Sequence, residues 1–106
     1  MLHIVNKSPF ESSALASCLA RVRAGAAVLL IEDAVYGAAA GAAHAAAPAL
    51  GKLAGAAGDG AAVYALGPDL AARGLAEDGL MKGVRVVDYE GFVELVAKHD
   101  GVQSWL

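Results

Sequence analysis

Short apolar runs rich in branched residues recur along the chain, with polar and small residues between them. Four of these runs predict strands: Leu2–Val5, Ala27–Ile31, Ala62–Leu66 and Val84–Val87. The run Ala27–Ile31 is apolar without alternation, which is typical of a strand covered on both faces. The strand starts are separated by roughly 20 to 35 residues, which leaves room for a helix each time and predicts βαβ units with right-handed crossovers.

The segment after the first strand predicts a helix with marked ends. Ser8–Glu11 reads Ser-Pro-Phe-Glu, a capping box with proline at the first helical position. Gly25 is expected to end this helix, and Arg21 and Arg23 would then place positive charge in its last turn.

Turn residues also punctuate the second half of the chain. Gly67–Asp69 is expected to break the third strand and to start a short helix through Arg73, which Gly74 stops. Asp88 is the predicted cap of a final helix, Tyr89–His99. The apolar stripe expected on that helix consists of Phe92, Leu95 and Val96.

The tail Val102–Leu106 adds a short fifth strand to this pattern. A chain of 106 residues is one domain, spanning residues 1–106. We therefore predict a three-layer α/β/α fold with a small parallel sheet of four to five strands and flavodoxin-like layering. In such folds a functional crevice lies at the carboxyl ends of the central strands, here around Asn6–Ser8.

The middle of the chain, Ala34–Ala62, is dominated by alanine and glycine. Its content of Leu, Ile and Phe is too low to drive membrane insertion, so we interpret it as a small-residue helical region packed close to the sheet. Within it, Gly58–Gly60 is interpreted as a turn before the third strand.

The net charge and the cysteine content argue against a nucleic-acid-binding protein and against a disulfide-bonded protein. With 8 basic and 11 acidic residues the net charge is −3, which argues against direct binding of nucleic acid. A single cysteine excludes an internal disulfide and fits a reducing cytosol. Met1 is followed at once by a predicted strand rather than by a signal peptide, so we expect a cytoplasmic protein without a membrane span.

No metal or cofactor site is expected. His3, His44 and His99 have no metal-ligand spacing, and neither GxGxxG nor a P-loop occurs. His3 is interpreted as a core residue bonded to backbone, and His99 as a complement to a helix C-terminus. The pair Glu32–Asp33 is interpreted as ordinary capping of a helix start. Trp105 is either a core plug or an interface anchor.

Cys18 is the candidate catalytic residue. On a helix, Leu15 and Leu19 point to one side of it and Arg21 to the other, which places the thiol at the border between core and solvent. Arg21 could then favour the thiolate, the form that attacks a persulfide or disulfide. The alternative is that Cys18 is a small hydrophobe that fills a gap.

Five blocks in order carry a resemblance to the DsrH/TusB family, the small subunit of the DsrEFH and TusBCD sulfur-relay complexes. They are Leu2–Cys18 (LHIVNKSPFESSALASC), Val28–Tyr36 (VLLIEDAVY), Val63–Leu75 (VYALGPDLAARGL), Val86–Val93 (VVDYEGFV) and Val102–Leu106 (VQSWL). The resemblance implies a five-stranded parallel sheet in which the first strand lies between the second and the fifth.

The resemblance also implies partners and a pathway. The chain would join DsrE/TusD-like and DsrF/TusC-like subunits in a heterohexamer that passes sulfur as a cysteine persulfide between donor and acceptor proteins. One branch of the family serves 2-thiolation of the wobble uridine of tRNA, and the other serves dissimilatory sulfur oxidation. Cys18 stands where the sulfur-oxidation branch carries a cysteine, which makes it a candidate persulfide carrier and leans toward that branch.

Two competing hypotheses remain open at this point. In one, the chain is a purely structural subunit of the heterohexamer with no thiol chemistry of its own. In the other, it is a small-molecule-binding flavodoxin-like domain that acts alone, which the lack of a phosphate loop disfavours. As a sulfur carrier it would be a non-autonomous part of a sulfurtransferase, so the sequence leaves open whether it is an enzyme.

Overall fold

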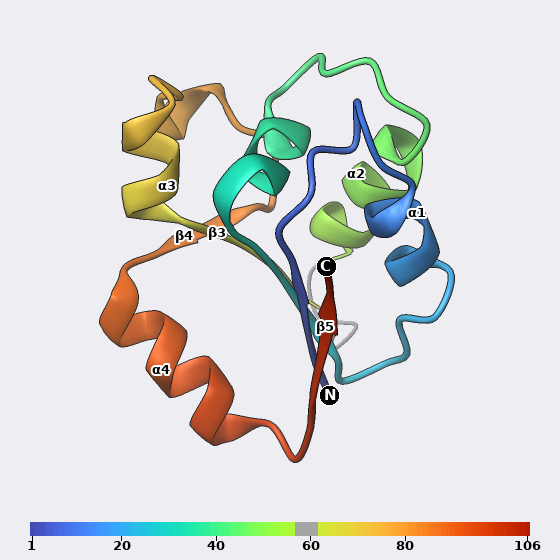
Figure 1. The fold of residues 1–106 in the computed structure, drawn as a ribbon, viewed down its shortest axis with the longest axis vertical. Helices are drawn as coiled ribbons and strands as arrows, with labels where there is room; N and C mark the ends of the chain where they lie inside the picture. Colours follow the sequence, from blue (N-terminus) through green and yellow to red (C-terminus); the bar gives the residue numbers. More distant parts are fainter. Residues whose placement is uncertain (57–61) are drawn as a thin grey trace.

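Five strands form one parallel sheet across residues 1–56 and 62–106, the residues that this computed structural model describes. The strands lie in the order β4-β3-β2-β1-β5 (Figure 1). Their bounds are β1 (Leu2–Val5), β2 (Ala27–Leu30), β3 (Ala62–Leu66), β4 (Arg85–Val87) and β5 (Val102–Trp105). The α/β fold predicted from the sequence is therefore confirmed, including the place of the first strand between the second and the fifth.

Helices cover both faces of this sheet unequally. The α-helices are α1 (Ala14–Leu19), α2 (Ala47–Gly55), α3 (Gly67–Ala72) and α4 (Tyr89–Lys98), and the 3-10 helices are η1 (Glu32–Ala38) and η2 (Glu77–Gly79). Helices α1 and α2 lie together on one side of the strands, whereas α4 lies on the other side (Figure 1).

Alternate residues of the strands feed two hydrophobic clusters, because successive side chains of a strand point to opposite faces. The α1/α2 cluster joins the helices α1 and α2 to one face of the sheet and includes Val5, Leu15, Cys18, Val28, Leu30, Leu50, Val63 and Leu70. The α4 cluster on the opposite face is smaller and consists of Leu2, Ile4, Ala27, Leu29 and Leu95, with Phe92 and Ile31 packed against it.

The predicted start and end of the first helix are wrong. Helix α1 begins at Ala14, after the N-cap position Ser13, and it ends at Leu19. The Ser8 hydroxyl accepts a hydrogen bond from the Phe10 backbone N–H at 3.2 Å, and the Ser8 carbonyl accepts from Ser12. Ser8 thus closes a local turn, a use of serine that competes with helix capping.

The early end of α1 also removes Arg21 and Arg23 from its last turn. Gly25 still has a structural role, because its φ of 86° lies in the left-handed region that glycine reaches without strain. It serves the turn into β2 rather than the end of the helix.

The second-half helices follow the sequence more closely. The Asp88 carboxylate accepts from the Gly91 backbone N–H at 2.8 Å, which confirms it as the cap of α4. Leu95 is buried and Phe92 packs against the α4 cluster, but Val96 is 38% exposed, so this part of the predicted stripe is wrong. The predicted turn Gly58–Gly60 lies outside the described residues.

The alanine-rich middle contributes most of η1 and all of α2, with Pro48 in the first turn of α2. Ala34, Ala38, Ala46 and Ala54 are all buried there. In the part of the chain that the structure describes, no helix combines the length and apolar character needed to cross a membrane.

Candidate functional site

Cys18 lies inside the α1/α2 cluster. Its side chain has no exposed surface, and it belongs to the same cluster as Leu15, Val28 and Leu50. The prediction of a thiol at the border between core and solvent is therefore wrong. The reason is that α1 is short and its Cys18 side packs into the cluster that also contains Ala34, Ala38 and Ala46 of the alanine-rich region.

Burial also sets the protonation state of this thiol. Removal from water disfavours the charged thiolate and raises the pKa of Cys18 to about 12. A protonated, inaccessible thiol is a poor nucleophile. In the conformation of the chain described here, Cys18 has the environment of a packing residue.

Arg21 makes its contacts elsewhere. Its guanidinium donates to the Ser17 carbonyl at 3.1 Å and lies over the Trp105 ring, 5.7 Å from the ring centroid. Neither contact involves Cys18. The role of Arg21 as a thiolate stabiliser stays a prediction, and the geometry gives it no support.

Trp105 and His3 form a hydrogen-bonded pair at the edge of the sheet. The Trp105 indole N–H donates to Nδ1 of His3 at 3.1 Å, and the ring centroids lie 6.2 Å apart. His3 is buried as predicted, but its partner is this side chain rather than backbone. Burial, and next the positive charge of the amino terminus, lowers the pKa of His3.

A second polar group gathers at the carboxyl ends of β1, β2 and β3. The Asn6 side-chain amide donates to the Glu32 carboxylate at 3.4 Å, and the Glu32 backbone N–H donates to the Asp69 carboxylate at 2.6 Å. Glu32 has a φ of 50°, an unusual value for a residue other than glycine. Oδ1 of Asn6 is buried without a hydrogen-bond partner among the described residues.

The acidic pair Glu32–Asp33 does not act as a helix cap. The N-cap position of η1 is Ile31, whose apolar side chain makes no capping hydrogen bond. Asp33 instead pairs with Arg73, whose Nε and Nη2 atoms lie 3.0 and 2.9 Å from the same carboxylate oxygen. Both residues lie in the first turn of η1, so the predicted helix start is confirmed, but neither side chain makes a capping hydrogen bond and that part of the interpretation is wrong. Their interactions tie η1 to α3.

The other two histidines bind backbone carbonyl groups. His99 lies 2.8 Å from the Leu95 carbonyl at the end of α4, as expected for a complement to a helix C-terminus. His44 lies 3.0 Å from the Gly37 carbonyl. Within the described ranges, no group of three or more His, Cys, Asp or Glu residues is placed to hold a metal ion.

The His3–Trp105 pair joins residues from the two ends of the chain and was not predicted. The signal that reveals it is the register of the parallel strands, in which His3 faces Gln103 and Val5 faces Trp105. Because His3 and Val5 share one face of β1, the Trp105 side chain emerges on the same side as the imidazole.

Comparisons with known proteins agree along nearly the whole chain. The family model described as DsrH like protein matches residues 7–102. The chain is similar to Protein TusB of Photorhabdus laumondii subsp. laumondii, at 35% identity over 107 residues that cover 99% of this chain and 100% of the relative. It is also similar to Protein TusB of Serratia proteamaculans, at 37% identity over 105 residues with the same coverage.

Solved structures share the fold. The ychN protein from E. coli has a TM-score of 0.77 at 19% identity, with 97% of each chain covered. The protein of unknown function MTH1491 from Methanobacterium thermoautotrophicum has a TM-score of 0.67 at 18% identity, covering 97% of this chain and 95% of that one. At these identities the likeness concerns the fold alone.

Proposed function

Because this chain belongs to the DsrH/TusB family, we propose that it is a subunit of a cytoplasmic sulfur-relay complex and serves that complex as a scaffold. A scaffold here is a subunit that holds its partners in position without carrying sulfur on its own thiol. The complete burial of Cys18 is the observation that carries this proposal.

The proposed partners are a DsrE/TusD-like and a DsrF/TusC-like subunit, arranged with this chain in a heterohexamer. The sulfur-accepting cysteine then belongs to the DsrE/TusD-like partner, and persulfide sulfur passes from a donor protein to an acceptor protein through that residue. This chain would reach RNA only through its partners, which agrees with its net charge of −3.

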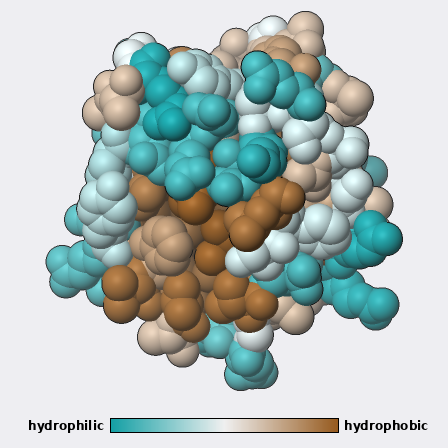
Figure 2. Space-filling view, in the orientation of Figure 1, coloured by the Kyte–Doolittle hydropathy of each residue, from teal (hydrophilic) through white to brown (hydrophobic). Residues whose placement is uncertain are grey.

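An exposed apolar surface supports a role that depends on partners. Val93 and Val96 of α4 and Val102 of β5 are 66%, 38% and 45% exposed, and we call the surface that they mark the α4–β5 face. Hydrophobic residues gather over this part of the molecule, bordered by a hydrophilic region above (Figure 2). Apolar patches of this kind are typical of protein–protein contacts.

Size favours the same conclusion. A domain of 106 residues buries a smaller fraction of its unfolded surface than a larger one does, so an added interface raises its stability appreciably. We expect the isolated chain to self-associate or to be poorly soluble, and we expect co-expression with its two relatives to rescue it. A monodisperse monomer that binds neither partner would contradict the proposed complex and would favour a domain that acts alone.

Sulfur transfer through the reconstituted complex tests the scaffold role. With Cys18→Ala in this chain, transfer of labelled sulfane sulfur from donor to acceptor should continue at the rate of the unmodified complex. The matched control replaces the sulfur-accepting cysteine of the DsrE/TusD-like partner, which should abolish transfer. If Cys18→Ala abolishes transfer while the complex still assembles, Cys18 is a persulfide carrier and the scaffold role is wrong.

The two family branches differ in the final acceptor. Under the proposal, the same scaffold serves either wobble-uridine 2-thiolation of tRNA or dissimilatory sulfur oxidation. Genes for a dissimilatory sulfite reductase beside this one would identify the second branch. Loss of 2-thiouridine from tRNA after deletion of this gene would identify the first.

A further inference from the structure

A small cavity lies between the start of β1 and the segment that joins α1 to β2. It has a volume of about 150 Å³ and is lined by Met1, His3, Arg21, Arg23 and Ala26. This is many times the space that one water molecule needs. Among the described residues that line it, two carry a guanidinium and none carries a carboxylate.

His3 can contribute one hydrogen-bond donor, its Nε2–H group. An indole N–H can only donate, so Nδ1 of His3 must be the acceptor of the bond from Trp105. A neutral imidazole that accepts at Nδ1 carries its proton on Nε2. His3 is neutral at neutral pH because burial lowers its pKa. The remaining polar group of this cavity-lining side chain is therefore an N–H donor.

Arg21 is held beside the same cavity. Its bond to the Ser17 carbonyl and its place over the Trp105 ring restrict the side chain. A guanidinium has five N–H donors, and only one of them is used in the bond to Ser17. The others are available to an oxygen-rich ligand, and Arg suits such ligands because its donors are arranged in a planar fork.

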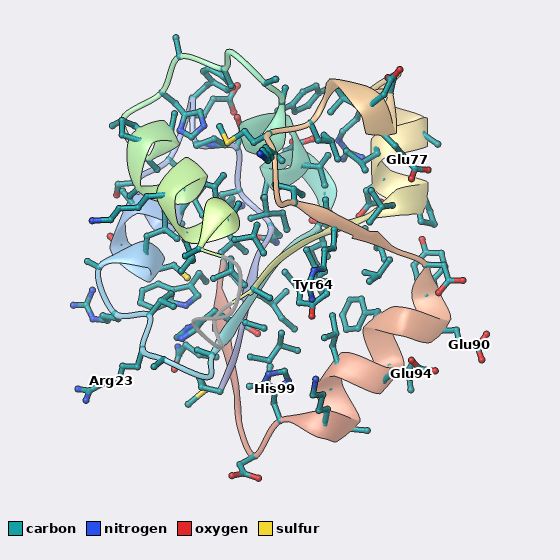
Figure 3. The ribbon with its side chains drawn as sticks, turned by 180° about the vertical axis from the view of Figure 1, so that it is seen from behind. Arg23, Tyr64, Glu77, Glu90, Glu94 and His99 are labelled. Atoms are coloured by element: carbon teal, nitrogen blue, oxygen red, sulfur yellow. The ribbon has the colours of Figure 1, made fainter. Side chains whose placement is uncertain are left out.

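Arg23 adds a second positive charge from the turn before β2. It lies on the side of the molecule away from Glu90 and Glu94 of α4, whose side chains project outward from the opposite edge (Figure 3). Those carboxylates are therefore not placed to neutralise the cavity. Ion pairs recorded for the described residues involve Arg73, not Arg21 or Arg23.

We propose that the cavity formed by His3, Arg21 and Arg23 is a binding site for a small dianionic oxyanion of the sulfate, thiosulfate or phosphate class. The side chains of Arg21 and Arg23 line the cavity together with Met1, and the charged amino terminus lies close enough to His3 to lower its pKa, so positive charge gathers here. The imidazole N–H of His3, another lining residue, adds a hydrogen-bond donor. A monoanion such as chloride or acetate balances less of this charge than a dianion does. The lining of the proposed site shares no residue with Val93, Val96 or Val102 of the α4–β5 face, and its test uses the chain without partners, so the result does not depend on the partner question.

The single tryptophan of the chain provides the readout. Because the Trp105 indole N–H bonds to His3 and its ring lies beneath Arg21, a ligand in the cavity should shift the indole N–H resonance in a 15N-labelled sample. We expect a saturable shift on titration of the full chain with sodium sulfate or sodium thiosulfate. Sodium chloride and sodium acetate at matched ionic strength should give no saturable shift.

Arg23→Gln is the decisive variant, because Arg23 is exposed and its loss leaves the Trp105 contacts in place. We expect sulfate affinity to fall roughly tenfold or more, the value of a charge-assisted hydrogen bond. Arg85→Gln is the matched control, since Arg85 also lies over an aromatic ring, that of Tyr64, but lines a different part of the molecule. It should bind sulfate as the unmodified chain does.

Three results would overturn the proposal. The first is an indole resonance that does not shift with sulfate or thiosulfate. The second is a shift of equal size with chloride at the same ionic strength, which would reduce the effect to charge screening. The third is equal weakening by Arg23→Gln and Arg85→Gln, which would show that net charge rather than this cavity determines binding.

Discussion

The two faces of the sheet differ in how completely the chain covers them. On the α1/α2 face, Leu15, Cys18 and Leu50 have no exposed surface. On the opposite face a single helix, α4, packs over the strands, and the side chains of Val93 and Val102 remain 66% and 45% exposed. One face is closed by the chain itself, and the other leaves apolar area in water.

The closed face stabilises the fold, whereas the open face provides apolar surface for contact with a partner protein. Burial of apolar area is the main source of folding stability, so the α1/α2 cluster contributes most to the fold. Exposed valines contribute little to the monomer and are available to a partner. Because Cys18 lies on the closed face, the only thiol of the chain is on the side built for stability.

Gly83→Ala should have the largest effect on the closed face. Gly83 has a φ of 95°, and a Cβ atom there would overlap the carbonyl oxygen of Ala54 in α2. Backbone strain and steric overlap together should lower the free energy of unfolding by up to about 6 kcal/mol or prevent folding. Gly25→Ala is the control, since its φ is 86° but nothing lies within 4 Å, and it should cost about 1 kcal/mol. Urea denaturation compares the two, and equal losses would show that α2 does not pack as closely as described.

Leu15→Ala should come next, with a loss of about 2 to 5 kcal/mol because it leaves a cavity in the α1/α2 cluster. Val96→Ala on the open face removes a side chain that is 38% exposed and should cost less than about 1 kcal/mol. Thermal or urea unfolding of the two variants measures the contrast between the faces. Similar losses would mean that the α4–β5 face is as well packed as the other one.

One aspartate and one serine test where the helices begin. Asp88→Ala removes the bond to the Gly91 N–H and should destabilise the chain by about 1 kcal/mol. Ser8→Ala removes only the turn bond to the Phe10 N–H and should cost less than about 0.5 kcal/mol. If the denaturant midpoint falls as far for Ser8→Ala as for Asp88→Ala, the capping box at Ser8–Glu11 forms after all.

Val93→Lys should have the smallest effect on stability and a large effect on assembly. The side chain is 66% exposed, so the unfolding free energy should change by less than about 0.5 kcal/mol. A charge in the centre of an apolar contact should abolish co-purification with the two proposed partners. Ala71→Lys, an exposed change on α3, is the control and should leave co-purification intact. Retention of both partners by Val93→Lys would exclude the α4–β5 face as their contact.

The strands could be predicted closely because their signal is local. The apolar runs Leu2–Val5 and Ala62–Leu66 match β1 and β3 residue for residue. Asp88 was likewise identified from the residues around it. The start of α1 was missed because Ser8 and Ser13 are both acceptable ends, and tertiary contacts rather than local chemistry select between them.

The candidate site could be predicted only in part, since it depends on contacts between distant residues. Helical angles placed Cys18 at a border because they assume a helix from Ser8 to Gly25, whereas α1 ends at Leu19. The His3–Trp105 bond and the Asp33–Arg73 ion pair join positions that no local pattern connects. The order and register of the strands are needed to find them.

The state of Cys18 in the assembled complex is the most direct test of the scaffold role. The complex is incubated with a persulfide donor and then with iodoacetamide at pH 8, and the intact mass of each subunit is measured. With a thiol that is buried and has a pKa of about 12, this chain should gain neither sulfur nor the alkyl group, while the DsrE/TusD-like partner gains one sulfur atom. A gain of one sulfur atom on this chain that Cys18→Ser removes would contradict the scaffold role and identify Cys18 as a carrier.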